Sequence, residues 1–298
     1  MASNSTNEFF PGRARTWQLR TRVLELPRRP LLMGIINVTP DSFSDGGHCL
    51  DPEAAVDCGL QLAADGADLL DVGGESTRPY AEQVSAAEEL QRVLPVIQRL
   101  APQVQIPVSI DTSKAVVARS AIDAGAEIIN DVTGLDGDPG MIPLAVSSGA
   151  AVCAMHMQGT PQTMQDNPQY GDVVAEVMEY LRTRRDELVT AGISLDRICL
   201  DPGIGFGKTH EHNITLMAHC HRLHRLGCPV LVGHSRKGFL GKLIGDKEAN
   251  RISTTIGASL ALAVQGVQII RVHDVRSVRE ALLAFDATGG FDSRGEVD

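Results

Sequence analysis

The stretch LLMGIINVTPDSFSDGG, residues 31–47, begins as an apolar run and ends in side chains that form hydrogen bonds. The apolar run has the length and composition of a buried strand. The polar segment after it is longer than the one or two turn residues that a short connection needs. We therefore expect a buried strand that ends in a ligand-handling loop.

The same pattern of an apolar run followed by a polar residue recurs along the chain. Segments with helical spacing lie between the runs, for example 52–65, 85–101, 172–191 and 210–226. Nearly apolar strands separated by helices are typical of a parallel sheet whose outer face is covered. The predicted strands are 31–37, 67–72, 107–111, 127–131, 150–156, 197–201, 229–233 and 268–272.

Eight such units favour an α/β fold built as a single (β/α)8 barrel, a TIM barrel. An open, doubly wound sheet shows the same alternation and is the alternative. In the open sheet only the strand ends near one crevice face a ligand, whereas in a barrel all eight surround one mouth. A polar residue follows every run, which favours the barrel: Asn37, Asp71, Asp111, Asn130, His156, Asp201, Ser235, and Arg271 with His273.

Composition limits the possible partners. The formal net charge of −10 argues against nucleic acid, because nucleic-acid-binding proteins usually present a basic face. No run approaches the roughly 18 apolar residues of a membrane-spanning helix, and the first ten residues do not resemble a secretory signal. The six cysteines contain no CxxC pair and are typical of a reducing compartment. We expect a cytoplasmic protein that binds neither nucleic acid nor membrane.

Two groups of strand ends could bind an anion. Thr77 and Arg78 follow the second run in DVGGESTRP, and a hydroxyl beside a guanidinium suits phosphate oxygens. A glycine-rich turn with a helix cap is the alternative there. Ser235 and Lys237 follow the seventh run, and Arg271 with His273 follows the eighth. Cations around one mouth of an acidic protein indicate a polyanionic group such as a diphosphate.

Three other strand ends have a different chemistry. Asp111, Asn130 and Asp201 carry carboxylate and amide groups that cannot stay buried without partners. A heterocycle with adjacent N–H groups would satisfy them, and Lys237 could reach its ring carbonyl. The alternative for each aspartate is a helix N-cap.

Two further segments need an interpretation. The histidine-rich segment 210–224 contains His221 and His224 at metal-ligand spacing, but we expect a solvated helix because no carboxylate or cysteine motif accompanies them. GIGFGK at 203–208 lacks the spacing of a nucleotide-binding phosphate loop, and Phe206 on it suits packing against a flat ligand.

The strand-end motifs resemble, in order, those of dihydropteroate synthase over roughly residues 31–275. The motifs are MGIINVTPDSFSDGG, DVGGESTRP, SIDTSK, INDVTG, MHMQGTP, DPGIGFGK, GHSRKGF and RVHD. The resemblance implies a transferase of folate biosynthesis. Such an enzyme condenses 6-hydroxymethyl-7,8-dihydropterin diphosphate with para-aminobenzoate and releases 7,8-dihydropteroate and pyrophosphate.

The resemblance also implies which residues bind each group. Sulfonamides would compete with para-aminobenzoate, the enzyme would be a homodimer, and the loop over residues 38–47 would close over the diphosphate. The implied residues are Asp111, Asn130, Met155, Asp201 and Lys237 for the pterin; Thr77, Arg78, Arg271 and His273 for the diphosphate; Thr77, Phe206, Ser235 and Lys237 for para-aminobenzoate; and Asn37 for Mg²⁺.

The departures from the family pattern are small. Tyr80 follows STRP where the family more often has glycine. We divide the chain into an extension (1–30) that includes a hairpin at the bottom of the barrel, the barrel itself (31–290) and a polar tail (291–298). A pterin-binding methyltransferase barrel and a non-catalytic pterin-binding paralogue are the alternatives, although neither accounts for the complete set of anion-binding motifs.

Overall fold

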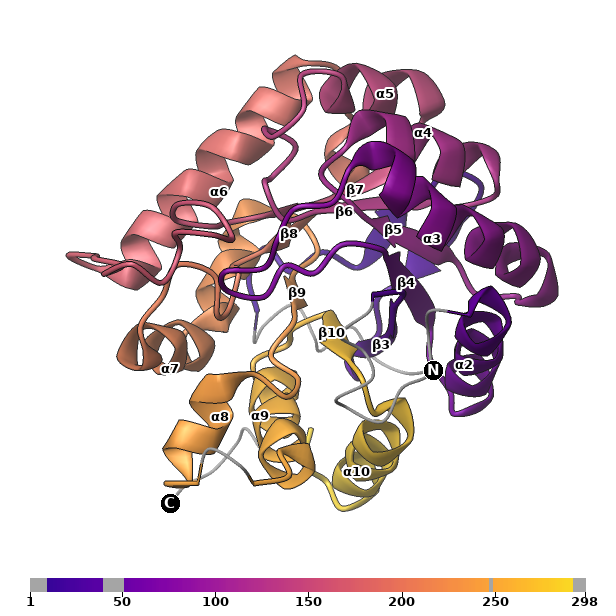
Figure 1. Cartoon of the computed structure of the whole chain (residues 1–298). Coiled ribbons are helices and arrows are strands. Elements are labelled where there is room, and N and C mark those ends of the chain that lie inside the picture. The colour runs from indigo at the N-terminus through magenta and orange to yellow at the C-terminus, as the bar shows by residue number, and fades with distance from the viewer. Residues whose placement is uncertain (1–9, 40–50, 247–248, 292–298) are drawn as a thin grey trace, which may run out of the picture.

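The computed structural model describes residues 10–39, 51–246 and 249–291. Eight parallel strands form one sheet in the order β8-β7-β6-β5-β4-β3-β10-β9. A bridge between Leu200 and Val230 joins the two outer strands and nearly closes the sheet into a barrel (Figure 1). The predicted barrel is confirmed, and the open sheet was the wrong alternative. The strands are β3 (Leu31–Asn37), β4 (Leu69–Gly73), β5 (Val108–Asp111), β6 (Ile128–Asp131), β7 (Ala151–Met155), β8 (Ile198–Asp201), β9 (Leu231–Val232) and β10 (Ile269–Val272).

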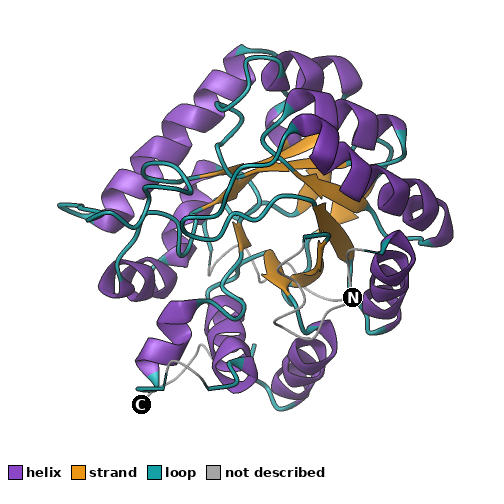
Figure 2. Cartoon of the chain, in the orientation of Figure 1, coloured by secondary structure: helices purple, strands orange, loops and turns teal. Residues whose placement is uncertain are grey.

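Helices surround the barrel (Figure 2). Several begin at a side chain that accepts a backbone N–H of the first turn, as Asp51, Ser85, Asp172 and Asp274 do. Outward-facing strand residues and the inner faces of these helices form the larger apolar core. The helices are α2 (Pro52–Ala64), α3 (Ala86–Leu100), α4 (Ala115–Asp123), α5 (Met141–Ser148), α6 (Val173–Thr190), α7 (His210–Ala218), α8 (Gly238–Leu243), α9 (Ile252–Val264) and α10 (Val275–Ala287).

A hairpin lies at the amino-terminal ends of the barrel strands. Strands β1 (Thr16–Gln18) and β2 (Val23–Glu25) pair antiparallel. Trp17 is fully buried against residues from the strand starts, including Met33 and Leu69, and its indole N–H donates to Arg197 O at 3.0 Å. This second apolar core forms the floor of the barrel.

The predicted helix over 210–226 was wrong in its second half. Helix α7 ends at Ala218, and a 3-10 helix (Cys220–Leu226) follows. A 3-10 helix places side chains three residues apart on one face. This spacing buries Cys220, Leu223 and Leu226 together.

Two other sequence-based predictions concern the membrane and the first loop. Within the described ranges, no helix combines the length and the apolar character that crossing a membrane requires. Residues 40–47 of the predicted closing loop lie outside the described residues.

Candidate active site

The site is a polar layer directly above the apolar floor. Successive strand residues alternate between the two faces of a sheet, so residues two apart share the barrel interior. Leu69 and Ile269 belong to the floor, and Asp71 and Arg271 come two residues later on the same strands. The same step carries the chain from Ile128 to Asn130, from Cys153 to Met155 and from Cys199 to Asp201. The strands therefore begin with apolar residues that form the floor, and most of them end in polar residues at the carboxyl end of the barrel.

Arg271 is the centre of the polar layer. Its Nε donates to Asp71 Oδ2 at 2.6 Å, and its Nη2 donates to Asp111 Oδ2 at 2.7 Å. Asn130 Nδ2 donates to the same Asp71 oxygen at 3.0 Å. Four strands, β4, β5, β6 and β10, thus meet in one hydrogen-bonded cluster.

This cluster joins residues that the sequence assigned to different ligands. Asp111, expected on a pterin, and Arg271, expected on a diphosphate, form an ion pair. Asp71 was noted as a strand end but given no role, yet its side chain is fully buried. Its Oδ1 has no hydrogen-bond partner among the described residues. The signal for Asp71 was a charge inside the apolar strand LLDVG.

The helix-cap alternatives for the aspartates were wrong. Helix α4 begins after Lys114 without a side-chain cap, and Asp138 Oδ2 accepts the N–H of Ala115 at 2.8 Å. Asp201 Oδ1 accepts the N–H of Gly203 at 2.7 Å in a tight turn. Burial raises the pKa of Asp111; the Arg271 guanidinium opposes the rise, and the Asp71 carboxylate adds to it.

Lys237 and Phe206 lie together, as predicted. The Lys237 ammonium is 4.5 Å from the centre of the Phe206 ring and also donates to Ile204 O. Gly205, next to Phe206, has φ +87°, a backbone conformation that favours glycine, and a Cβ there would lie 2.9 Å from Lys237 Cδ. Burial lowers the pKa of Lys237 to about 8, although the Asp201 carboxylate opposes the shift.

Two more pairs of predicted residues meet. Ser235 Oγ accepts the His273 N–H at 3.3 Å and lies 3.0 Å from His273 Nδ1. Met155 is buried and pairs in register with Asp201 on the neighbouring strand. The residues expected to bind para-aminobenzoate and diphosphate therefore touch at Ser235, and those expected to bind the pterin are adjacent at Met155.

Lys208 was not predicted to have a role. It is 2% exposed, and its ammonium lies 2.9 Å from each of Gly203 O, Phe206 O and His156 Nδ1. Three acceptors match the three donors of an ammonium group. Burial lowers the pKa of Lys208 to about 7. The lysine thus holds the loop that carries Phe206 from beneath.

Thr77, Arg78 and Asn37 lie at the same end of the barrel. Asn37 is the last residue of β3, and the other two lie on the loop after β4. The helix-cap alternative for that loop was wrong, since Ser85 caps α3. Tyr80 has φ +63°, which explains why glycine suits this position. Its hydroxyl donates to Asp166 Oδ1 at 3.1 Å.

The histidine-rich segment is not simply solvated. His224 is fully buried, its Nε2 lies 3.0 Å from Gln265 O, and its ring meets the Phe10 ring edge-on. His221 Nδ1 lies 3.3 Å from Gln265 Oε1. These contacts fix the segment against α9, so His224 is a buried structural residue.

Comparisons with known proteins identify the family of this chain. The pterin binding enzyme family matches residues 33–273. The dihydropteroate synthase of Escherichia coli K12 is 46% identical over 260 residues, covering 87% of this chain and 92% of that protein. The chain belongs to the dihydropteroate synthase family. It is thus related to transferases of folate biosynthesis.

Solved structures of the dihydropteroate synthase family share the fold. The Yersinia pestis enzyme in a sulfonamide drug complex has a TM-score of 0.87 and 43% identity, covering 92% of this chain and 99% of that one. The Xanthomonas albilineans enzyme with 4-aminobenzoic acid has a TM-score of 0.85 and 46% identity, covering 92% and 98%. A second structure of the Xanthomonas enzyme holds 7,8-dihydropteroate.

Proposed function

We propose that the polar layer performs the reaction of the dihydropteroate synthase family. It would join 6-hydroxymethyl-7,8-dihydropterin diphosphate to para-aminobenzoate and release 7,8-dihydropteroate and pyrophosphate. The observation that carries the proposal is the Arg271 cluster, in which a cation suited to the diphosphate is bonded directly to Asp111, a carboxylate suited to the pterin. The relatives with bound 4-aminobenzoic acid and 7,8-dihydropteroate support it.

The pterin would lie against Asp111, Asn130, Met155 and Asp201. Asp201 uses Oδ1 for the Gly203 N–H, and its Oδ2 accepts no hydrogen bond from the described part of the chain. A carboxylate oxygen with no protein donor can accept an N–H group of an amino-pyrimidine edge. Arg271 holds Asp111 at one oxygen and thereby fixes the angle of this second carboxylate.

The diphosphate would bind Thr77, Arg78, Arg271 and His273. Arg271 uses Nε and Nη2 for its two carboxylates, and within the described ranges Nη1 makes no hydrogen bond. A guanidinium nitrogen held in this way can donate to a phosphate oxygen without a further ordering cost. The pyrophosphate would therefore leave from a point directly beside the pterin.

Para-aminobenzoate would bind Thr77, Phe206, Ser235 and Lys237. Lys237 donates to Ile204 O, and an ammonium group has two further donors. One can bind the pterin carbonyl and the other the benzoate carboxylate. The Phe206 ring beside this ammonium offers a flat apolar surface to the aromatic substrate.

Mg²⁺ fits this site with Asn37 as its protein ligand. The Asn37 side chain is half-buried at the end of β3 and supplies a hard amide oxygen. Mg²⁺ usually binds one or two protein oxygens together with substrate phosphates and water. When bound, the ion would neutralise negative charge on the diphosphate.

The proposed chemistry breaks the bond between the pterin methylene carbon and a diphosphate oxygen. Pyrophosphate leaves with the electron pair, the amine nitrogen of para-aminobenzoate bonds to the carbon, and the nitrogen gives one proton to the departing pyrophosphate or to water. Asp111 and Asp201 favour the positive charge that develops on the ring, while Arg271 favours the negative charge on the leaving group. Both effects are electrostatic and depend on position.

The test measures pyrophosphate release and 7,8-dihydropteroate formation with purified full-length protein. We expect product only when both substrates and Mg²⁺ are present, with loss of product on adding EDTA. A sulfonamide should raise the KM for para-aminobenzoate and leave the maximal rate unchanged. Binding of the pterin diphosphate without any product would refute the proposal and identify a non-catalytic pterin-binding paralogue.

We also propose that the protein acts as a cytoplasmic homodimer. The five cysteines in the described part of the chain are all free, which suits a reducing compartment. Light scattering after size-exclusion chromatography should give twice the chain mass of 31.9 kDa. A mass of one chain would refute the dimer.

A further inference from the structure

The loop between β4 and α3 is fastened at both of its ends. Gly74 O accepts Arg92 Nη1 at 2.7 Å, and Glu75 Oε1 accepts the N–H of Val84 at 3.0 Å. These bonds close residues 75–84 into a ring at the edge of the barrel mouth. Thr77 and Arg78 lie inside this closed loop.

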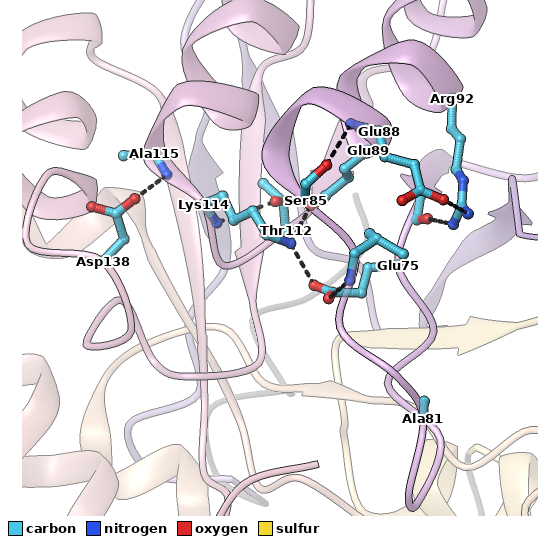
Figure 3. Close-up of polar contacts among 12 residues, drawn as sticks. Glu75, Ala81, Ser85, Glu88, Glu89, Arg92, Thr112, Lys114, Ala115 and Asp138 are labelled. Atoms are coloured by element: carbon cyan, nitrogen blue, oxygen red, sulfur yellow. Dashed lines mark hydrogen bonds and ion pairs between the residues drawn. The ribbon is translucent and has the colours of Figure 1, made fainter. Parts of the chain in front are cut away.

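Lys114 holds the other oxygen of Glu75. Its ammonium lies 2.7 Å from Glu75 Oε2 and 2.6 Å from Glu89 Oε2 (Figure 3). The Glu89 side chain is fully buried, whereas those of Lys114 and Glu75 are 23% and 16% exposed. One cation therefore connects the β4 loop, helix α3 and the turn after β5.

The backbone at Lys114 is itself fixed. Its N–H donates to Thr112 Oγ1 at 3.2 Å, and the Thr112 N–H donates to Asn130 O at 3.0 Å. The lysine also comes three residues after Asp111, which ends β5. The ammonium thus reaches the β4 loop from a turn anchored to the polar layer.

Burying these charges contributes little net stability. Desolvation of a buried ion pair offsets much of its Coulomb attraction, although removal of one partner alone leaves the other charge buried and unpaired. The directional bonds of the ammonium instead restrict where Glu75 can lie. Burial opposes the charged form of Lys114, but the two carboxylates raise its pKa. Lys114, which we call the brace because it connects Glu75 and Glu89, therefore stays charged at neutral pH.

We propose that Lys114 is a positioning residue that, through Glu75, fixes the Thr77–Arg78 loop relative to Asp111. The inference rests on the proposed function, because it takes Thr77 and Arg78 as ligands of the diphosphate and of para-aminobenzoate. Loss of the brace would misplace these ligands, but Asn130 and Asp201 would remain in place. Catalysis and pterin affinity should therefore respond differently.

The experiment compares Lys114→Met, Glu75→Gln and Lys114→Arg with the unaltered protein. We expect kcat/KM for para-aminobenzoate to fall by about 100-fold in Lys114→Met, the size of effect that a misplacement of about 1 Å produces. The Kd for 6-hydroxymethyl-7,8-dihydropterin, which lacks the diphosphate, should change less than about threefold. Lys114→Arg should recover part of the loss because it restores a cation.

Coupling between Lys114 and Glu75 provides a second test. If they act through one contact, the double variant Glu75→Gln with Lys114→Met should be no slower than Lys114→Met alone. Multiplying losses would contradict the proposal. The matched control is Lys242→Met, which removes a 57% exposed lysine 3.9 Å from Glu211. It should change neither kcat/KM for para-aminobenzoate nor the Kd for the pterin.

Other outcomes separate the brace from general damage and from the proposed function. An equal loss of pterin affinity and of kcat/KM, or no change in either, would overturn the proposal. If the unaltered protein makes no product, the proposed function fails, and proteolysis then tests the brace alone. A glutamate-specific protease should cut after the exposed Glu82 about tenfold faster in Lys114→Met, since cleavage follows local opening. An unchanged cutting rate would refute the brace.

Discussion

Replacing Arg271 by methionine tests whether the guanidinium stabilises two carboxylates inside the barrel. Arg271 lies 2.6 Å from Asp71 and 2.7 Å from Asp111, and the Asp71 side chain is fully buried. Methionine keeps much of the volume but leaves both carboxylates without their cation. Removing one partner of a buried ion pair costs about 3–5 kcal/mol, and we expect a loss of this size in the free energy of unfolding at about pH 8.

Arg182 provides the matched control. It also contacts two carboxylates, Glu179 and Asp186, but its side chain is 48% exposed. Exposed ion pairs contribute about 0–1 kcal/mol, so Arg182→Met should lose less than about 1 kcal/mol. Urea unfolding can be followed by the fluorescence of Trp17, the single tryptophan, which is fully buried in the barrel floor.

The loss should also depend on pH. Burial raises the pKa of Asp111, and Arg271 opposes this rise, so the variant raises that pKa further. A carboxyl group with a raised pKa binds more protons in the folded chain than in the unfolded one. Its contribution to stability therefore falls as pH rises from the unfolded pKa near 4 to the folded value. The deficit of Arg271→Met should be smaller at about pH 5.5 than at about pH 8. A deficit below about 1 kcal/mol, or one that is the same at both pH values, would refute the reasoning.

Three other changes have definite expected outcomes. Asp201→Asn should weaken pterin diphosphate binding by about 100-fold, measured by calorimetry, because an amide donor would face a ring donor; unchanged affinity would contradict the assignment. Because the pKa of Lys237 is lowered to about 8, its charge is lost above that pH. The KM for para-aminobenzoate should then rise, whereas Lys237→Arg should give a KM that does not vary with pH; a flat profile in both proteins would exclude this role. Lys208→Met should cost about 2–4 kcal/mol in urea unfolding because three acceptors, including Phe206 O, lose their donor, while Lys242→Met should cost less than about 0.5 kcal/mol. Equal costs for the two lysines would contradict the interpretation of Lys208.

The barrel could be predicted because each strand is marked by neighbouring residues in the sequence. An apolar run such as LLMGIIN fixes a strand, and the polar residue at its end marks the mouth. The broken helix after Ala218 was missed for a tertiary reason. Burying Cys220, Leu223 and Leu226 against the core selects a 3-10 spacing that an α-helical pattern over the same residues does not reveal.

The sequence selected candidate site residues but did not show which of them contact one another. Asp111 and Arg271 were both selected as strand ends, yet 160 positions separate them and no local pattern shows that they pair. Their pairing follows from the closed order of the strands, which brings β10 to β3, next to β4 and β5. Asp71 was passed over for the same reason, since its partners come from β6 and β10.

Lys114 and Lys208 have structural roles that their sequence motifs do not reveal. Both lie in motifs that also contain a residue expected to bind a ligand, Asp111 in SIDTSK and Phe206 in DPGIGFGK, but their ammonium groups bond to the protein itself. A lysine side chain has a long flexible stem, so its sequence position does not determine where its charge lies. Lys208 is buried and Lys114 is partly exposed, and each bonds to a loop whose neighbouring residues are proposed to touch substrate. A site built from charged strand ends therefore needs two kinds of cation. Arg271 and Lys237 are proposed to bind the ligands, whereas Lys114 and Lys208 bond to the loops on which other proposed ligand-binding residues lie.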